Sequence, residues 1–316
     1  MSALNDDANW RKKALAVLRA GGVVGVPTET VYGLAGDATR ADAVAAIYAA
    51  KGRPAHNPLI AHVADLAMAE RLAVFDDRAR KLAEAFWPGP LTLVLPLQDG
   101  AGLAAAVTAG GESLAVRYPR GPLRELAEAL GAPLAAPSAN RSGHVSSTSA
   151  HHVLSDLQGR IPLILDGGAT KLGLESTILD VRGPDAILLR PGAIDAEKLE
   201  AVLEHNIIAA TTSGAAPVAP GQLASHYAPN VPVRLNVPAK DVRAGEAYLG
   251  FGHHALDGHP NLSQAGDLAE ASERLYAALR TLDKQNPTAI AIAPIPGGGL
   301  GQALNDRLQR AAAPRG

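Results

Sequence analysis

Short apolar runs, each broken by glycine, proline or serine, are the feature that most restricts how this chain can fold. Examples between residues 91 and 192 are "LTLVLPL", "SLAVRYP", "PLAAPS", "PLILDGG", "STILDV" and "AILLRPG". Runs of this length and composition are typical of buried β-strands. Helix-like stretches such as "PLRELAEALG" and "DAEKLEAVLEH" lie between some of them. Strands that alternate with helices, together with consecutive strands over residues 161–191, predict an α/β domain built on a mixed sheet.

The composition and periodicity of the sequence change after about His205. Residues 211–232, "TTSGAAPVAPGQLASHYAPNVP", are rich in small residues and proline and show no helical or strand period. Such a stretch is typical of a linker. Strand-like and helix-like segments then alternate again as far as "GQALNDRLQRAAA". We therefore predict a large α/β domain over residues 1–206, a linker over 207–230 and a small α/β domain over 231–316.

Composition narrows the class of protein. The 316 residues suffice for two domains, and the formal net charge of −2 argues against a strongly basic surface for nucleic acids. The absence of cysteine excludes disulfides, thiolate zinc sites and cysteine nucleophiles, and it fits a reducing cytosol. No apolar run reaches the roughly 18 residues that span a bilayer, and the N-terminus is a poor signal peptide. We expect a soluble, cytoplasmic protein with no membrane partner.

The stretch "KGRPAHNPLIAHV" places two cations, Lys51 and Arg53, beside two prolines. Pro54 and Pro58 each restrict the residue before them to extended geometry, so this peptide is partly preset. A site that binds an oligophosphate requires cations whose positions are fixed before the ligand arrives. A helix C-terminus carrying two cations that favour its dipole is an equally good interpretation of this stretch alone.

Further polar stretches follow apolar strands: "VPTETVYGLAGDA", "APSANRSGHVSST" and "LGLESTILDV". Taken singly, each has a plain interpretation as a capped turn or a flexible serine-rich loop. Arg117 and Arg190 each end an apolar strand, and each alone is best explained by a structural ion pair. Collected by one sheet, these groups favour a site for an anionic ligand. No P-loop motif occurs, and the ten histidines show no metal-binding spacing.

These strings also resemble a known family. In this order, "PTETVYGL", "KGRP" with "NPL", "FWPGPLTLVL", "RYP", "PSANRSG", "DGG", "ESTILD" and "LLRPGA" resemble the motifs of the YrdC-like threonylcarbamoyl-AMP synthases. The stretches "APGQLASHYAP" and "NDRLQRA" resemble the long, two-domain form, so the resemblance covers almost the whole chain. It implies a twisted, open, mixed-sheet catalytic domain joined by the linker to a small Rossmann-like C-terminal domain.

The resemblance implies an enzyme that condenses L-threonine, bicarbonate and ATP into threonylcarbamoyl-AMP and pyrophosphate, which is a nucleotidyltransferase reaction. A downstream transferase complex would then modify the tRNA adenosine next to the anticodon. A weak contact with tRNA or double-stranded RNA is left open. The alternative is an RNA-binding module of the same fold without catalysis, against which the net charge argues.

The resemblance also implies two groups of site residues. The L-threonine group comprises Thr30, His62, Arg117, Ala136 and Ser176. The ATP group comprises Lys51, Arg53, Asn57, Ser113, Ser138, Ser146, Arg190 and Tyr227. Mg²⁺ is expected to accompany ATP and to be held mainly by phosphate oxygens and water. We expect the linker to act as a lid, with Tyr227 reaching over the nucleotide.

Overall fold

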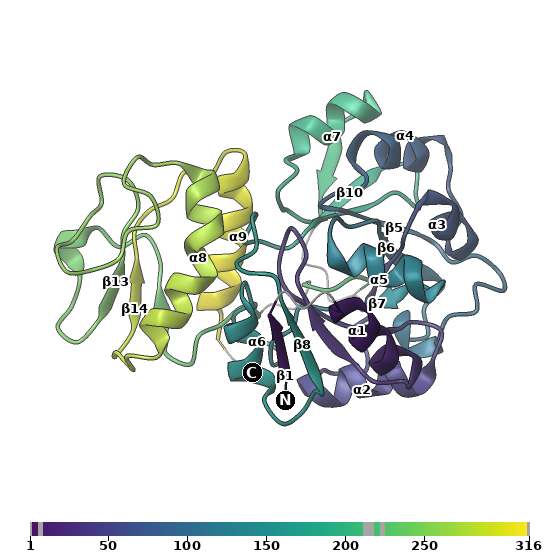
Figure 1. Ribbon diagram of the computed structural model, residues 1–316. Helices are drawn as coiled ribbons and strands as arrows, with labels where there is room; N and C mark the ends of the chain where they lie inside the picture. Colours follow the sequence, from purple (N-terminus) through teal and green to yellow (C-terminus); the bar gives the residue numbers. More distant parts are fainter. Residues whose placement is uncertain (1, 6–8, 211–217, 222–224, 315–316) are drawn as a thin grey trace.

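The computed structural model of the protein describes residues 2–5, 9–210, 218–221 and 225–314. Within these ranges the chain forms a large mixed sheet with helices around it and a smaller sheet with two helices (Figure 1). Parts of the predicted linker, residues 211–217 and 222–224, lie outside the described residues.

The large sheet has eleven strands in the order β1-β8-β2-β3-β7-β4-β6-β5-β9-β10-β11. Neighbours run both ways: β4 is parallel to β6, β5 is antiparallel to β6 and parallel to β9, and β9 is antiparallel to β10. The strands are β1 (Ser2–Asn5), β2 (Val24–Val26), β3 (Gly33–Asp37), β4 (Ile60–His62), β5 (Leu91–Pro96), β6 (Ser113–Arg117), β7 (Leu134–Ala135), β8 (Leu163–Asp166), β9 (Thr177–Asp180), β10 (Ala186–Arg190) and β11 (Ile207–Ala209).

The helices of the large domain begin and end on residues suited to those positions. Side chains of Asp65, Asp76, Ser149 and Asp195 cap α3, α4, α6 and α7 by accepting a backbone N–H from the first turn. Gly52 ends α2 in the left-handed conformation. The helices are α1 (Trp10–Arg19), α2 (Ala41–Lys51), α3 (Leu66–Leu72), α4 (Asp77–Phe86), α5 (Pro122–Leu130), α6 (Ala150–Leu157) and α7 (Ala196–Leu203), with a 3₁₀ turn η1 (Ala105–Val107).

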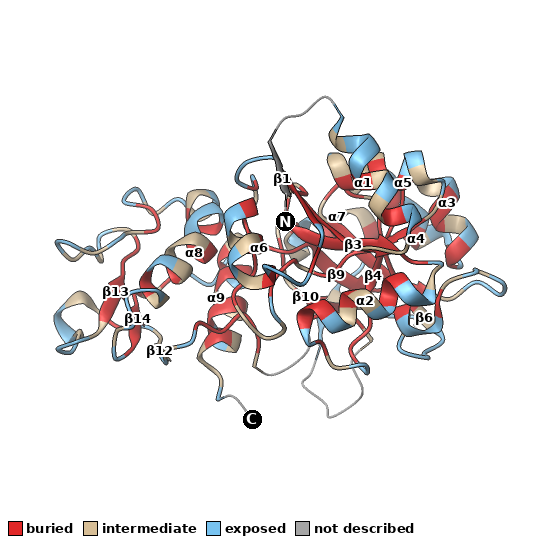
Figure 2. Cartoon of the chain, turned by 60° about the horizontal axis from the view of Figure 1, so that its bottom comes forward, coloured by how far each residue is buried: buried red, intermediate tan, exposed pale blue. Residues whose placement is uncertain are grey.

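The central strands are buried on both faces, which explains why their sequences are continuous apolar runs rather than alternating ones. Figure 2 shows these strands as the buried centre, with exposed residues on the outer faces of the surrounding helices. Because aromatic residues are scarce, Ala, Val and Leu supply most of this core.

The C-terminal unit is a three-stranded parallel sheet in the order β12-β14-β13, formed by β12 (Val233–Arg234), β13 (Ala247–Leu249) and β14 (Ile290–Ile292). Its helices are α8 (Leu268–Asp283) and α9 (Leu300–Ala312), with a 3₁₀ turn η2 (Ala239–Asp241). In Figure 1, α8 and α9 lie between this small sheet and the large domain. A second hydrophobic core packs the small sheet, α8 and α9 together, and it includes Val31 and Val145 of the large domain.

The predicted fold class, a mixed-sheet α/β domain followed by a small α/β unit, is confirmed. The Rossmann-like character of the C-terminal unit and the domain bounds stay predictions. Sequence patterns missed β3 and β4, because these strands are short and one of them contains two glycines. Residues 207–209, which open the predicted linker, pair as β11 with β10. Among the described residues, no helix is long and apolar enough to cross a membrane.

Candidate active site

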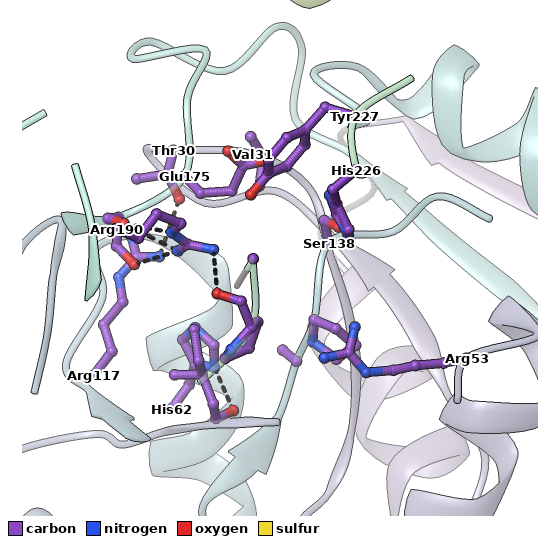
Figure 3. A pocket seen from close by; sticks show the side chains of 16 residues that line it. Thr30, Val31, Arg53, His62, Arg117, Ser138, Glu175, Arg190, His226 and Tyr227 are labelled. Atoms are coloured by element: carbon purple, nitrogen blue, oxygen red, sulfur yellow. Dashed lines mark hydrogen bonds between the residues drawn. The ribbon is translucent and has the colours of Figure 1, made fainter. Parts of the chain in front are cut away.

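A cavity opens where strand ends and loops of the large sheet meet the C-terminal part of the predicted linker, residues 220–221 and 226–227. It encloses about 470 Å³ of empty space, including solvent at its mouth. Figure 3 shows Arg117 and Arg190 on one side, Arg53 on the opposite side, and Tyr227 and His226 across the top. The cavity is lined by Thr30, Val31, Arg53, Ile60, His62, Arg117, Ala136, Pro137, Ser138, Glu175, Ser176, Arg190, Pro220, Gly221, His226 and Tyr227.

All five residues predicted for L-threonine line this one cavity, although they come from different parts of the chain. His62 ends β4 and Arg117 ends β6, and these two parallel strands pair the two residues directly. Thr30 lies in the loop between β2 and β3. Ala136 directly follows β7, and Ser176 directly precedes β9. The register of the strands therefore brings the five residues predicted for L-threonine together at one end of the sheet.

Arg117 is held firmly in the cavity wall. Its Nε donates to the carbonyl oxygen of Gly89 at 3.2 Å and its Nη1 donates to Thr30 Oγ1 at 3.0 Å. Its Nη2 lies 2.9 Å from a carboxylate oxygen of Glu29, with side-chain exposures of only 5% and 12% for the two residues. A guanidinium has five N–H donors. Nη1 and Nη2 therefore each keep at least one unengaged N–H donor for a carboxylate ligand.

His62 is a neutral member of the site. Burial, together with the positive charge of Arg117, lowers its pKa from 6.5 to about 3. Its Nδ1 lies 3.1 Å from the carbonyl oxygen of Ile60. A carbonyl oxygen only accepts, so the neutral ring carries its proton on Nδ1. Near pH 7 this side chain adds a polar surface to the cavity without adding charge.

Arg190 reaches the cavity from the end of β10. Its Nε and Nη2 donate to the carbonyl oxygen of Ser176 at 3.1 and 3.0 Å, and Nη2 also lies 3.1 Å from Ser176 Oγ. Nη1 lies 3.4 Å from the carbonyl oxygen of Pro220. Ser176 Oγ in turn shares a hydrogen bond of 2.7 Å with Thr92. These partners fix the guanidinium, yet none of them carries a negative charge.

Arg53 fills the opposite wall and organises its own loop. Its Nε donates to the carbonyl oxygen of Asn57, and its Nη2 donates to Asn57 Oδ1 and to the carbonyl oxygen of Pro58, both at 2.7 Å. Burial lowers the pKa of Arg53 to about 10, which leaves it charged near neutrality. The amide nitrogen of Asn57 is buried and has no hydrogen-bond partner among the described residues. Asn57 does not line the cavity, so its contact with ATP stays a prediction.

Lys51 lies behind the cavity rather than in its lining. It is the last residue of α2, and its Nζ donates to the carbonyl oxygens of Ser138 (2.5 Å) and Asn140 (2.6 Å). Burial holds the pKa of Lys51 well below its usual range, and repulsion from Arg53 acts in the same direction. Lys51 therefore fixes the loop that carries Ser138, a predicted ATP residue that does line the cavity.

Besides Lys51 and Asn57, two residues predicted for ATP lie outside the cavity lining. Ser146 is fully buried and donates to Oε1 of Glu175, which does line the cavity. Ser113 begins β6, at the opposite end of that strand from Arg117, and pairs with Pro96. The structure therefore brings Ser146 to the site indirectly and leaves Ser113 apart, and the roles assigned to both stay predictions.

The C-terminal part of the predicted linker closes the top of the cavity. Tyr227 has a φ of +60°, which is uncommon for a bulky residue. The residues on either side of it are hydrogen-bonded to distant parts of the chain. His226 N donates to the carbonyl oxygen of Arg310 on α9, and Ala228 N donates to that of Gly143 in the loop before α6. The hydroxyl of Tyr227 and Nδ1 of His226 have no hydrogen-bond partner within the described parts of the chain. Both side chains line the cavity, so both are free to meet a ligand.

The two predicted groups omit several residues of this site. Glu29 holds Arg117, while Glu175 and His226 line the cavity. Glu175 and His226 stood beside the predicted Ser176 and Tyr227, and that adjacency was the only signal in the sequence. Gly221 was also missed: a Cβ atom there would come within 2.9 Å of both Arg190 Cδ and the Tyr227 hydroxyl.

Acid is expected to destabilise the fold through the buried histidines. The pKa values of His62 and His226 are lowered to about 3, chiefly by burial. Below pH 6.5 the unfolded chain takes up protons that the native state does not bind. The free energy of unfolding should therefore fall by up to about 1.4 kcal/mol per pH unit for each histidine as the pH decreases from 6.5 to 5. Urea unfolding across this range measures it.

Variants of two histidines separate this effect from general acid sensitivity. His226→Gln should reduce the slope of stability against pH, because one of the two buried groups is gone. His205→Gln, at an exposed position after α7, should leave the slope unchanged. A stability of the unsubstituted protein that stays flat between pH 6.5 and 5 would contradict the neutral, buried state of both rings.

The fold and the cavity define an α/β protein with a small site, lined by three arginines, at the strand ends of its large sheet. Residues 16–192 match the Sua5, YciO and YrdC family model, described as "Telomere recombination", and residues 194–313 match "Threonylcarbamoyl-AMP synthase, C-terminal domain". The chain therefore belongs to the Sua5 family of threonylcarbamoyl-AMP synthases.

Similar proteins agree with this placement over nearly the full length. The threonylcarbamoyl-AMP synthase of Bacillus subtilis is 40% identical, with 96% of this chain and 93% of that protein covered. The one from Pyrococcus abyssi is 38% identical, with 96% and 94% covered. The crystal structure of P. abyssi Sua5 complexed with L-threonine superimposes with a TM-score of 0.89 at 36% identity, covering 98% of this chain and 96% of that one.

Proposed function

We propose that this protein is an L-threonylcarbamoyladenylate synthase, which joins L-threonine, bicarbonate and ATP into threonylcarbamoyl-AMP and pyrophosphate. The observation that carries the proposal is the single cavity that gathers Arg53, Arg117 and Arg190 with a neutral histidine and several hydroxyl groups. Three guanidinium groups around so small a space suit a substrate pair with a carboxylate and a polyphosphate.

L-threonine belongs on the side of Arg117. The two unengaged donors of its guanidinium would hold the amino-acid carboxylate as a fork, while Glu29, Thr30 and Gly89 keep the group from turning. His62, being neutral, would not compete with Arg117 for that carboxylate. The crystal structure of the P. abyssi relative in complex with L-threonine supports a threonine pocket in this fold.

ATP belongs between Arg53 and Arg190, beneath Tyr227. Both guanidinium groups are fixed by neutral partners, so their charge is free to stabilise phosphate oxygens. Mg²⁺ would enter with ATP as part of that substrate. Phosphate oxygens and water would hold most of the coordination positions of this ion.

The chemistry then needs positioning more than a protein nucleophile. The neutral amine of threonine combines with bicarbonate to give a carbamate, with loss of water. A carbamate oxygen attacks the α-phosphorus of ATP, the bond to the β-phosphate oxygen breaks, and pyrophosphate leaves. The protein would act as a nucleotidyltransferase by aligning the reactants and stabilising the growing negative charge. Tyr227 and the linker, acting as a lid, would exclude water from the labile carbamate.

Incubation of the purified protein with ATP, Mg²⁺, bicarbonate and each amino acid in turn tests the proposal. We expect a product with the mass of threonylcarbamoyl-AMP only when threonine is present, together with one pyrophosphate per product. The absence of the acyl-adenylate under all of these conditions would refute the assignment. The downstream transferase complex and any direct contact with tRNA stay predictions.

A further inference from the structure

Glu175 lies where the two domains meet, and residues of the C-terminal unit hold its carboxylate. Its Oε2 accepts from Nε of Arg307 on α9 at 2.8 Å and from the hydroxyl of Tyr276 on α8 at 2.9 Å. Its Oε1 accepts from Ser146 Oγ in the large domain. The side chains of Arg307 and Glu175 are 0% and 7% exposed. Both oxygens of a cavity-lining carboxylate are thus occupied, mostly by groups from outside the catalytic domain.

The same two C-terminal residues also hold the ring of Tyr227. Cζ of Arg307 lies 5.2 Å from the centre of that ring, and the ring of Tyr276 stacks on it at 5.9 Å with an interplanar angle of 24°. Nη1 of Arg307 pairs with Asp306 at 2.6 Å, while Nη2 has no hydrogen-bond partner among the described residues. The guanidinium is close enough to the ring of Tyr227 for a cation–π contact. Arg307 therefore contacts the cavity wall twice without lining the cavity.

The charge arrangement explains why an arginine is needed at this point. Glu175 is within electrostatic reach of Arg190 as well as Arg307. Burial alone would raise the pKa of Glu175, but the attraction of the two guanidinium groups and the hydrogen bond from Ser146 lower it to about 2. Glu175 is therefore a full negative charge near neutral pH. Without Arg307, its nearest compensating cation would be Arg190, which the substrate polyphosphate needs.

We propose that Arg307 is a positioning residue for the nucleotide side of the active site: it neutralises Glu175, and it thereby leaves the charge of Arg190 to the polyphosphate. This role gives the C-terminal unit a direct part in building the site, beyond carrying the end of the linker. The inference rests on the proposed function, because it assumes that Arg190 faces phosphate groups. Tyr276 has a lesser share, since it contributes a neutral donor to the same oxygen of Glu175.

Binding of a non-hydrolysable ATP analogue with Mg²⁺ to Arg307→Met tests the inference, with L-threonine binding measured in parallel by calorimetry. We expect the analogue to bind about tenfold more weakly or worse, while the affinity for threonine stays within about twofold. Arg274→Met on α8 is the matched control, because Arg274 pairs with Glu270 at an exposed site. It should leave both affinities unchanged. An equal loss of threonine and analogue binding in Arg307→Met would overturn the inference.

The double variant Glu175→Gln with Arg307→Met separates charge compensation from a merely structural role. Removal of the carboxylate removes the need for its partner, so the double variant should recover at least half of the lost affinity on a logarithmic scale. A smaller recovery would overturn the inference. If Arg307→Met does not fold, as judged by its thermal unfolding, Tyr276→Phe and the double variant are compared with the wild type. A double variant that binds the analogue about tenfold more weakly than the wild type would then refute it.

These binding measurements remain informative whatever the turnover assay gives. If the wild-type protein makes no acyl-adenylate, the proposed reaction fails. The dependence of analogue affinity on Arg307 and Glu175 would still stand or fall by itself.

Discussion

Arg117→Lys is expected to weaken L-threonine binding by about a hundredfold while leaving ATP affinity near that of the wild type. Lysine keeps the positive charge beside Glu29, which limits the loss of stability from an unpaired buried carboxylate. It cannot reproduce the planar fork, however, and it cannot keep the bonds to Gly89 and Thr30 at the same time. Loss of a charge-assisted pair of hydrogen bonds costs about 2–3 kcal/mol, which corresponds to this change in affinity.

The KM values for threonine and ATP in a pyrophosphate-release assay provide the measurement. Arg234→Lys is the matched control, because Arg234 pairs with the almost buried Glu246 in the second sheet and does not line the cavity. The control should keep wild-type kinetics. A threonine KM for Arg117→Lys within a few-fold of the wild type would show that the amino-acid carboxylate binds elsewhere.

Arg53→Met should have the converse effect and weaken ATP binding by about a hundredfold or more. Methionine fills much of the apolar volume of the arginine stem but supplies no charge to the phosphates. The loss would be enlarged because Arg53 also orders its loop through Asn57 and Pro58. A charged hydrogen bond within a low-dielectric site commonly contributes about 2–4 kcal/mol to a developing or bound anion.

Titration with an ATP analogue measures this affinity, and a threonine titration of the same variant serves as an internal reference. Arg160→Met is the matched control. Arg160 donates to the carbonyl oxygen of Ala50, near the end of the helix α2 that precedes Arg53, but Arg160 itself is exposed. It should bind ATP normally. If Arg53→Met binds the analogue as well as Arg160→Met does, the nucleotide lies outside this wall of the cavity.

Much of the site could be predicted because its residues belong to local strings. Arg53 follows a helix end and precedes two prolines, while Arg117 and Arg190 each end an apolar strand. A charged residue at the end of a buried strand must find a partner or a ligand, so these positions stand out in a single sequence. The structure places all three in one cavity.

Other parts of the site could not be predicted from local strings. Two of the partners of Glu175 lie more than a hundred positions further along the chain, and nothing local to Arg307 distinguishes it from Arg310, the other arginine of α9. Lys51 was expected near phosphate, but its Nζ contacts backbone carbonyl oxygens that become neighbours only when the fold is complete. Ser113 shows the opposite case, since its position in a motif did not bring it to the cavity.

The sequence by itself determined the alternation of short buried strands with helices, the break after the large domain and the identity of the cations. These follow from apolar runs, from turn-forming residues and from charge, each of which acts over a few positions. The tertiary structure alone decided which of those cations share one cavity. It also decided that Arg307 and Tyr276, on the C-terminal helices, hydrogen-bond to Glu175 in the cavity wall. The reason is that strand register and domain packing set distances between residues far apart in the chain, and a local pattern contains no information about those distances.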